Sequence, residues 1–187
     1  IKKIYLTRHK LILRPFLGTI IGVQTKKPFV ALTFDDGPHP IYTPMVLDIL
    51  SKYRARTTFF IVGEMAARYP ELVHRMKRSG HAIGNHSWDH SSFPKIPANE
   101  RKIHIKRWEE VVGEQPMKLF RPPYGHQTIG TRLQLWRYGY RVVTWSTTIE
   151  DWLPLSAETA AERICQKGRP GVILLMHDAH HKSRLDK

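Results

Sequence analysis

The feature that most constrains the fold is an alternation of short apolar segments with amphipathic ones. Six segments have the composition of buried strands, at residues 29–34, 57–63, 81–85, 117–120, 140–146 and 171–176. Five segments between them have helical periodicity, at 43–53, 70–80, 98–112, 128–138 and 156–168. Strands joined through helices pair in parallel, and strands without a polar face are covered on both sides. The pattern predicts an α/β fold, with a (β/α) barrel, complete or incomplete, as the leading architecture and a doubly wound open sheet as the alternative.

Residues at the predicted helix ends support these boundaries. Thr43 fits an N-cap, with Pro44 at the first helical position. Ser156 fits the N-cap of the last helix, which Gly168 closes. The single cysteine, Cys165, lies in that helix and is expected to be a small core residue.

The chain has 187 residues, a length that suggests one domain. We expect a lead-in segment at 1–27 and one domain at 28–187. No window approaches the ~18 uninterrupted apolar residues of a membrane span, because Arg14 and Pro15 break the nearest stretch. The chain starts at Ile1, and only a polar tail follows the last predicted strand. We therefore expect a fragment or processed form, with room for a signal peptide or anchor upstream and a truncation at the C-terminal end.

The formal net charge is +14, from 30 basic and 16 acidic residues. A field of this sign favours anionic partners such as nucleic acid, anionic lipid or an acidic polymer. The basic residues are scattered in short groups, and none of the common nucleic-acid-binding motifs is present. We therefore expect no specific nucleic-acid partner, and the oligomeric state is left open.

Polar, reactive side chains follow five of the six predicted strands. They are Asp35 and Asp36, then the "HSWDH" segment at 86–90, "RPPYG" at 121–125, Asp151 with Trp152, and His177 with Asp178. The carboxyl ends of parallel strands share one face of an α/β fold, and active sites are built there. The sequence therefore predicts one site that collects these residues.

A metal centre is the simplest chemistry for this set. His86 and His90 are four residues apart, a spacing that lets both imidazoles reach one ion. Asp35 or Asp36 can supply a third ligand, and a cation offsets the repulsion between two adjacent carboxylates. Three protein ligands with an open water position are typical of a catalytic zinc site. The predicted chemistry is metal-assisted hydrolysis of a polarised carbonyl.

The motifs "TFDDGP", "HSWDH", "RPPYG", "DW" and "LLMHD" occur in this order. In this order the set resembles the polysaccharide deacetylase family (the NodB-homology domain, carbohydrate esterase family 4), over about residues 28–180. The resemblance implies a distorted (β/α) barrel that removes acetyl groups from N-acetylated or O-acetylated sugars. It implies a divalent metal, most often Zn²⁺, with Co²⁺ or Mn²⁺ as alternatives.

The resemblance also implies a role for each motif residue. Asp36, His86 and His90 would hold the metal, and Asp35 would be the base that activates water. Arg121 would orient Asp35, and the backbone N–H of Tyr124 would face the oxyanion. Asp151 would raise the pKa of His177, the acid for the leaving amine. Trp152 and Leu175 would wall the pocket for the acetyl methyl group.

One position departs from the family pattern: Thr148 stands where many relatives carry an acidic residue. The leading hypothesis is a bacterial cell-wall enzyme that deacetylates an N-acetylated glycan, either peptidoglycan or a chitin-like polymer. The alternatives are a catalytically silent carbohydrate-binding relative and an O-acetyl esterase that acts on acetylated xylan. The charge favours an additional anionic cell-wall polymer as a partner. An extracytoplasmic or cell-envelope location is favoured, and a cytoplasmic one is left open.

Overall fold

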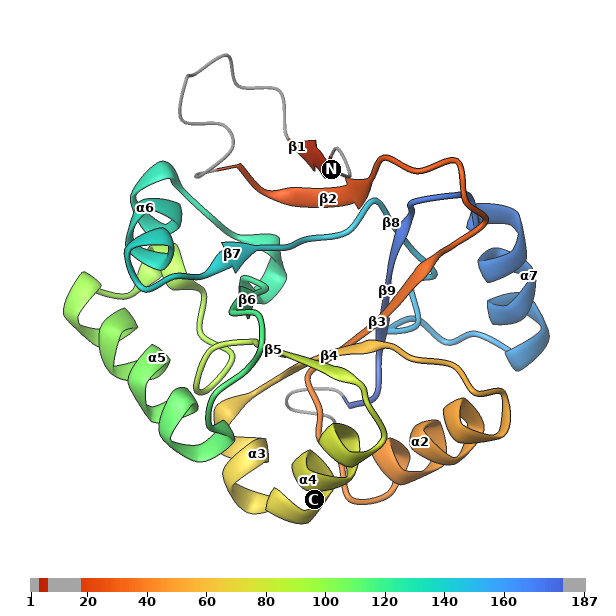
Figure 1. Cartoon of the computed structure of the whole chain (residues 1–187), viewed down its shortest axis with the longest axis horizontal. Coiled ribbons are helices and arrows are strands. Elements are labelled where there is room, and N and C mark those ends of the chain that lie inside the picture. The colour runs from red at the N-terminus through yellow and green to blue at the C-terminus, as the bar shows by residue number, and fades with distance from the viewer. Residues whose placement is uncertain (1–3, 7–17, 180–187) are drawn as a thin grey trace.

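The structure is a computed structural model that describes residues 4–6 and 18–179. Its centre is a curled parallel sheet with the strand order β7-β6-β5-β4-β3-β9-β8 (Figure 1). The strands are β3 (Ala31–Asp35), β4 (Thr58–Ile61), β5 (Ala82–Asn85), β6 (Leu119–Phe120), β7 (Arg141–Val142), β8 (Thr147–Thr148) and β9 (Ile173–His177). The curl confirms the distorted barrel and is not the open sheet of a doubly wound fold.

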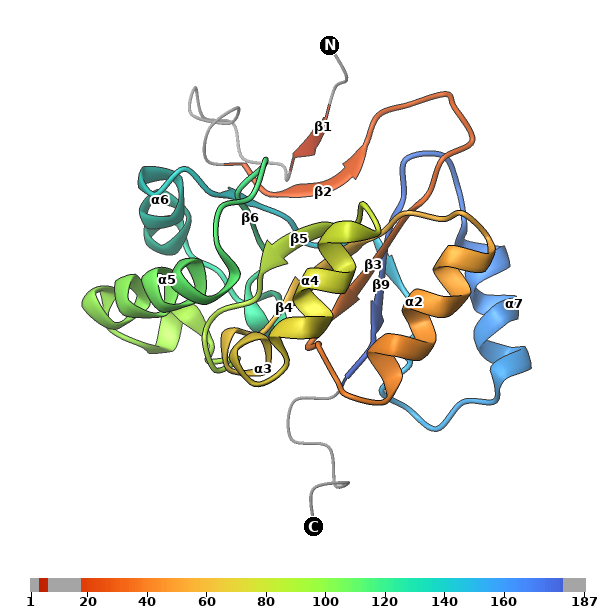
Figure 2. The same ribbon diagram turned by 60° about the horizontal axis from the view of Figure 1, so that its bottom comes forward.

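Helices cover the outside of the curled sheet (Figures 1 and 2). They are α2 (Tyr42–Lys52), α3 (Gly63–Arg68), α4 (Pro70–Arg78), α5 (Ala98–Val112), α6 (Ile129–Arg137) and α7 (Ala157–Lys167), with short 3-10 turns η1 (Phe93–Lys95) and η2 (Pro123–Gly125). All five predicted helices are present, and α3 is an additional short one. The tail after residue 179 lies outside the described residues.

The lead-in segment contributes strands of its own. β2 (Ile20–Val23) pairs antiparallel with β1 (Ile4–Leu6). Isolated bridges join Ile20 to Val143 and Gly22 to Val172, so β2 touches strand-connecting segments from both sides of the curled sheet. The N-terminal segment therefore helps to close the barrel.

The predicted strand at 140–146 is wrong in its extent. Only Arg141–Val142 pairs with β6, and the chain then crosses to β8, which pairs with β9 at the other edge of the sheet. Along the crossing, the Thr144 N–H donates to the Ile20 carbonyl and the Ser146 N–H donates to the Ile173 carbonyl. An apolar run that changes partners cannot be distinguished from one strand by periodicity.

The helix-end predictions are partly confirmed. Ser156 caps α7 by accepting a hydrogen bond from the Thr159 N–H, and Gly168 is the C-cap. Thr43 is not an N-cap: α2 begins at Tyr42, and the Thr43 side chain is buried against another element. The expectation that Cys165 is a core residue is wrong: its side chain is exposed, because α7 turns this position away from the sheet.

Strand alternation separates two apolar layers. Phe60, Val143 and Ile173, from strands that are not neighbours, pack together inside the curl. Phe59 and Ile61 point outward and pack against α2, α4 and α5. The inner cluster fills the barrel below the carboxyl ends of the strands.

In the described part of the chain, no helix has the length and hydropathy that a membrane crossing requires.

Candidate active site

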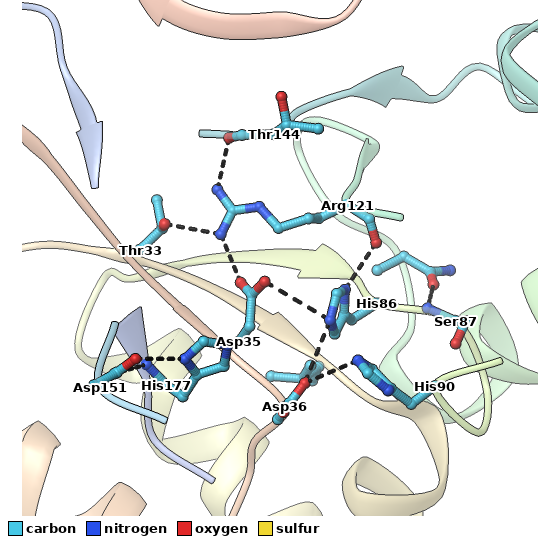
Figure 3. Close-up of polar contacts among 12 residues, drawn as sticks. Thr33, Asp35, Asp36, His86, Ser87, His90, Arg121, Thr144, Asp151 and His177 are labelled. Carbon is cyan, nitrogen blue, oxygen red and sulfur yellow. Dashed lines mark hydrogen bonds and ion pairs between the residues drawn. The ribbon is translucent and has the colours of Figure 1, made fainter. Parts of the chain in front are cut away.

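The predicted convergence of polar residues occurs. The ten labelled residues in Figure 3 come from β3, β9 and the segments that follow β3, β5, β6, β7 and β8, and they meet at the carboxyl ends of the strands. Asp35 ends β3 and pairs in register with His177, which ends β9. This register places the first and last motifs side by side although they are far apart in sequence.

Three of the predicted ligands form a compact donor set. The Nε2 atoms of His86 and His90 lie 3.4 Å and 3.2 Å from Oδ1 of Asp36 (Figure 3). One ligand atom from each residue lies within 4.8 Å of the others, and all three residues are buried. His86 Nδ1 lies 2.8 Å from the Arg121 carbonyl, which can only accept, so the other ring nitrogen is turned toward Asp36. Two imidazoles and one carboxylate at these separations fit a divalent metal of the zinc type.

The charge of Asp36 depends on its two histidines. Burial by itself would raise the pKa of the carboxyl group. Hydrogen bonds and positive charge from His86 and His90 outweigh burial and hold the pKa well below its usual range. The carboxylate is therefore ionised across the pH range in which a metal ligand must be.

Asp35 faces the other way, toward a buried arginine. Its Oδ1 accepts a hydrogen bond of 2.6 Å from Nη1 of Arg121, which is fully buried. Arg121 also donates to the Thr33 hydroxyl at 2.8 Å and to the Thr144 carbonyl at 3.0 Å. Its guanidinium lies 4.0 Å from the centre of the Phe60 ring at the top of the inner apolar cluster. Burial lowers the pKa of Arg121 and the Asp35 charge opposes that shift, so the two groups form a buried ion pair.

His177 and Asp151 form a second pair across the site. Nδ1 of His177 lies 2.8 Å from one carboxylate oxygen of Asp151, and the backbone N–H of His177 donates to the other oxygen at 2.7 Å. Burial would lower the pKa of His177, but the hydrogen bond and charge of Asp151, with the charges of Asp36 and Asp35, raise it overall. Both the position and the protonation of this imidazole are therefore set by Asp151.

The loop that carries Asp151 is held by α7. Arg163 donates to the Ile149 carbonyl at 2.8 Å and to the Glu150 carboxylate at 2.9 Å. Thr148, the position that departs from the family pattern, accepts from the Glu150 N–H through its hydroxyl at 3.1 Å. The hydroxyl stabilises the turn directly before Asp151 without an acidic side chain at this position.

The remaining predicted residues lie around the same centre. The exposed Tyr124 ring is edge-on to His90, with 4.6 Å between ring centres. The half-exposed Trp152 ring is edge-on to His177 at 5.7 Å. Leu175 is buried on β9 two residues before His177, so strand alternation directs both side chains to the inside of the barrel. All ten predicted site residues are thus at or beside one centre.

Sequence reasoning assigned no role to Asp178, which directly follows His177. The Thr43 hydroxyl donates to Oδ2 of Asp178 and accepts from the His39 N–H. The Asp178 carboxylate also lies where a Cβ on Gly37 would stand, within 2.4 Å, so only glycine fits there. Burial raises the pKa of Asp178 to about 7. Asp178 and Thr43 thus support the turn that follows Asp36.

Backbone strain is concentrated in these loops. Six described non-glycine residues have a left-handed conformation, namely Asp36, Arg54, Ser87, His90, Tyr124 and Glu150. All except Arg54 lie in the site loops. Left-handed backbone costs about 1–3 kcal/mol for such residues and persists only where the surroundings impose it. At Ser87 the Asn85 side chain does so, because it accepts the Ser87 N–H at 2.8 Å.

Comparison with known proteins identifies the family. A sequence model of the polysaccharide deacetylase family matches residues 22–143. The chain belongs to the polysaccharide deacetylase family. It is 36% identical over 155 residues to a peptidoglycan-N-acetylglucosamine deacetylase of Bacillus cereus, with 81% of this chain and 56% of the relative covered. It is 35% identical over 166 residues to a chitooligosaccharide deacetylase of Azorhizobium caulinodans, with 87% and 79% covered.

A solved structure of the Bc1960 peptidoglycan N-acetylglucosamine deacetylase is also similar. Its TM-score is 0.80 at 34% identity, and the match covers 84% of this chain and 75% of that one. The chain spans little more than half of the Bacillus cereus relative with 36% identity. These findings confirm the polysaccharide deacetylase class and the NodB-type fold that the five motifs indicate.

Proposed function

We propose that the protein is a metal-dependent hydrolase that removes acetyl groups from N-acetylated sugars of a polysaccharide. The observation that carries the proposal is the order of the groups across the site. A carboxylate held by Arg121 lies on one side of the Asp36–His86–His90 set, and His177 held by Asp151 completes the site. This order supports a mechanism in which a base, a metal and an acid act around one small volume.

Asp36, His86 and His90 would hold the metal, with Zn²⁺ as the best fit and Co²⁺ or Mn²⁺ as alternatives. A divalent ion bound there supplies Lewis-acid polarisation of the acetyl carbonyl and a lowered pKa of water. The fit rests on the donor atoms, which are two imidazole nitrogens and a carboxylate oxygen. Binding of the metal also offsets the repulsion between Asp35 and Asp36.

Asp35 takes a proton from the attacking water, and the water oxygen bonds to the acetyl carbon. Arg121 holds the receiving carboxylate in place through its 2.6 Å hydrogen bond. The Tyr124 backbone N–H stabilises the negative charge that develops on the acetyl oxygen. His177 then gives a proton to the sugar nitrogen as the carbon–nitrogen bond breaks, which releases acetate and a free amine. A raised pKa suits this role, because His177 must be protonated near neutral pH.

Trp152 and Leu175 would enclose the methyl group of the acetyl substituent. The similarity to relatives named for peptidoglycan and for chitooligosaccharide supports an N-acetylglucosamine-containing glycan as substrate. We propose a bacterial peptidoglycan as the favoured polymer, because the charge of +14 suits an acidic cell wall. An extracytoplasmic or cell-envelope location follows from that substrate.

Two substitutions test the division of labour between the adjacent carboxylates. Asp36→Ala should lower zinc affinity by more than ~100-fold and abolish acetate release, because a ligand itself is removed and not a residue that supports one. Asp35→Asn should keep zinc affinity within about threefold and lower kcat at least ~100-fold, because only the base is lost. Zinc titration and acetate release are measured on the same preparations.

Acetate release is compared across peptidoglycan, chitooligosaccharide and acetylated xylan, before and after chelation. Loss of activity on chelation, with recovery on added zinc, supports the proposal. Equal loss of zinc affinity in both variants would show that the roles are assigned wrongly. Tight glycan binding without acetate release under any metal would identify a silent binding protein, and release from xylan alone would identify an O-acetyl esterase.

A further inference from the structure

The end of the barrel opposite the active site carries a continuous cationic surface. We define the cationic base as the segments 26–30, 52–56, 78–81 and 168–172, which precede β3, β4, β5 and β9. Figure 2 shows this end at the top, where β2 crosses the barrel. The four segments are neighbours because their strands lie side by side in the order β5-β4-β3-β9.

Hydrogen bonds and a side-chain contact connect the segments directly. The Gly171 N–H donates to the Phe29 carbonyl at 2.8 Å. The Thr57 hydroxyl donates to the Leu32 carbonyl, which ties the segment before β4 to β3. The Arg56 guanidinium lies against Gly80, 3.4 Å from the place of a Cβ there. The base is therefore one surface, and its charges act together.

No Asp or Glu occurs in any of the four segments. Seven exposed cations do: Lys26, Lys27, Lys52, Arg54, Arg56, Arg78 and Arg169. Within the described part of the chain, none of the seven forms an ion pair with a carboxylate. An uncompensated group of like charges is unfavourable for the folded protein by itself.

Helix dipoles account for only two of these cations. Lys52 and Arg78 lie in the last turns of α2 and α4, where positive charge stabilises a helix end. Lys26, Lys27, Arg54, Arg56 and Arg169 are in loops and have no such role. These five cations therefore have no stabilising role within the fold, which favours an anionic binding partner.

Two aromatic side chains project from the same surface. Phe29 is 63% exposed and Tyr53 is 71% exposed. Each is next in sequence to the cations: Phe29 follows Lys27 by two residues, and Tyr53 lies between Lys52 and Arg54. Exposed aromatic rings among lysines and arginines are the pattern of proteins that lie on a membrane interface.

The opposite end of the barrel carries acidic residues, which the base lacks. Acidic residues occupy the first turns of four helices that begin there, at Glu64, Glu71, Glu100 and Glu158. An anionic surface would attract the base, which has cations and no carboxylate.

We propose that the cationic base docks on a bilayer that contains anionic phospholipid, with the catalytic end directed away from the lipid. Phosphate headgroups would pair with the seven cations, and the Phe29 and Tyr53 rings would enter the headgroup region. The aromatic rings favour lipid over an anionic wall polymer, since a purely polar polymer has no use for them. Docking would hold the enzyme at the membrane and present its site to glycan beyond it.

The test is co-sedimentation of the full chain with vesicles of phosphatidylcholine alone or with about 30% phosphatidylglycerol. Binding is expected only to the anionic vesicles and should fall as salt rises from about 0.05 to about 0.5 M. The combined variant K26Q/K27Q/K52Q/R54Q should weaken binding on the order of 1,000-fold. Phe29→Ser with Tyr53→Ser should weaken it on the order of 10-fold, with less change in the salt dependence.

The matched control removes the same charge from elsewhere in the molecule. Arg68, Lys95, Lys102 and Lys106 are exposed and lie outside the base, and their combined change to Gln should leave vesicle binding within about threefold. Circular dichroism and acetate release from a soluble oligosaccharide report whether each variant folds. Neither quantity depends on docking, so a failure of the proposed activity would not be mistaken for a failure to dock.

Three results would overturn the proposal. Equal losses in the two fourfold variants would mean that net charge, and not the base, drives binding. Equal binding to neutral and anionic vesicles would exclude headgroup charge. Binding to a soluble polyphosphodiester that depends on the base cations but not on Phe29 and Tyr53, without vesicle binding, would assign the base to a wall polymer.

Discussion

The buried ion pair between Arg121 and Asp35 makes the most quantitative prediction. Arg121 has no solvent exposure, and it is the side chain seen to donate to Asp35 Oδ1. In Arg121→Met the new side chain can still cover the Phe60 ring, so the apolar contact below is largely kept. The carboxylate of Asp35 is then left buried with His86 as its remaining partner, 3.7 Å away.

Removing one partner of a buried pair costs about 3–5 kcal/mol, because the other charge stays desolvated. That is a large part of the ~5–15 kcal/mol that holds a typical domain folded. If the cost arises from the orphaned charge, Asp35→Asn should relieve part of it in the Arg121→Met background. The two substitutions are therefore expected to be non-additive by at least about 2 kcal/mol.

The assay is urea unfolding of the four proteins of the cycle in the presence of a chelator, with unchanged m values as the check for comparable unfolded states. The control is Arg75→Met, which breaks a solvated pair with Asp48 and should cost only about 0–1 kcal/mol. Additivity of the two buried substitutions within about 0.5 kcal/mol would refute the reasoning. It would mean that Arg121 stabilises the fold by packing and not by compensating the Asp35 charge.

Three further predictions concern neighbouring groups. Asp151→Asn removes the negative charge that helps to raise the pKa of His177, so the alkaline limb of the kcat/KM profile should move to lower pH. An unmoved limb would contradict the assignment of the acid. Thr43→Val should lower stability by about 1–3 kcal/mol and zinc affinity about tenfold, because the hydrogen bond to Asp178 is lost. Thr57→Val is the control: it loses a hydroxyl hydrogen bond to the Leu32 carbonyl, far from the site, and should lower stability alone. Because burial raises the pKa of Asp178 to about 7 in the folded protein, protonated Asp178 stabilises the fold at low pH, and the unfolding free energy falls as pH rises toward 7. Asp178→Asn cannot ionise, so its unfolding free energy should fall less over this pH range. Urea unfolding of the chelated protein at a series of pH values measures the difference.

The fold could be predicted to the level of its class because each strand and helix carries its own local signal. The segments that could not be predicted are those whose structure depends on distant partners. Thr147–Thr148 forms a strand only because Leu174 and Leu175 lie beside it. Ile20–Val23 closes the barrel through bridges to Val143 and Val172. Neither interaction leaves a pattern in the local sequence.

The site residues could be predicted because each follows a strand of its own, and parallel strands bring such positions together. The supporting residues could not. Thr43 and Asp178 are 135 positions apart, and the Thr43 sequence context fits a helix cap equally well. The left-handed backbone of Asp36, Ser87 and His90 could not be predicted either, because none of these positions is a glycine, the residue that usually adopts this conformation.

The adjacent carboxylates show why geometry must decide between two chemically equal candidates. Strand alternation predicts that Asp35 and Asp36 point apart, yet both approach the same nitrogen of His86, at 3.7 Å and 3.4 Å. The left-handed backbone of Asp36 turns its side chain back toward the site. The difference between the two lies in their other partners: an oxygen of Asp35 is taken by Arg121, and Asp36 is shared between two histidines. A guanidinium at one carboxylate disfavours a second cation there, which supports the proposed assignment of the metal to Asp36 and of the proton to Asp35.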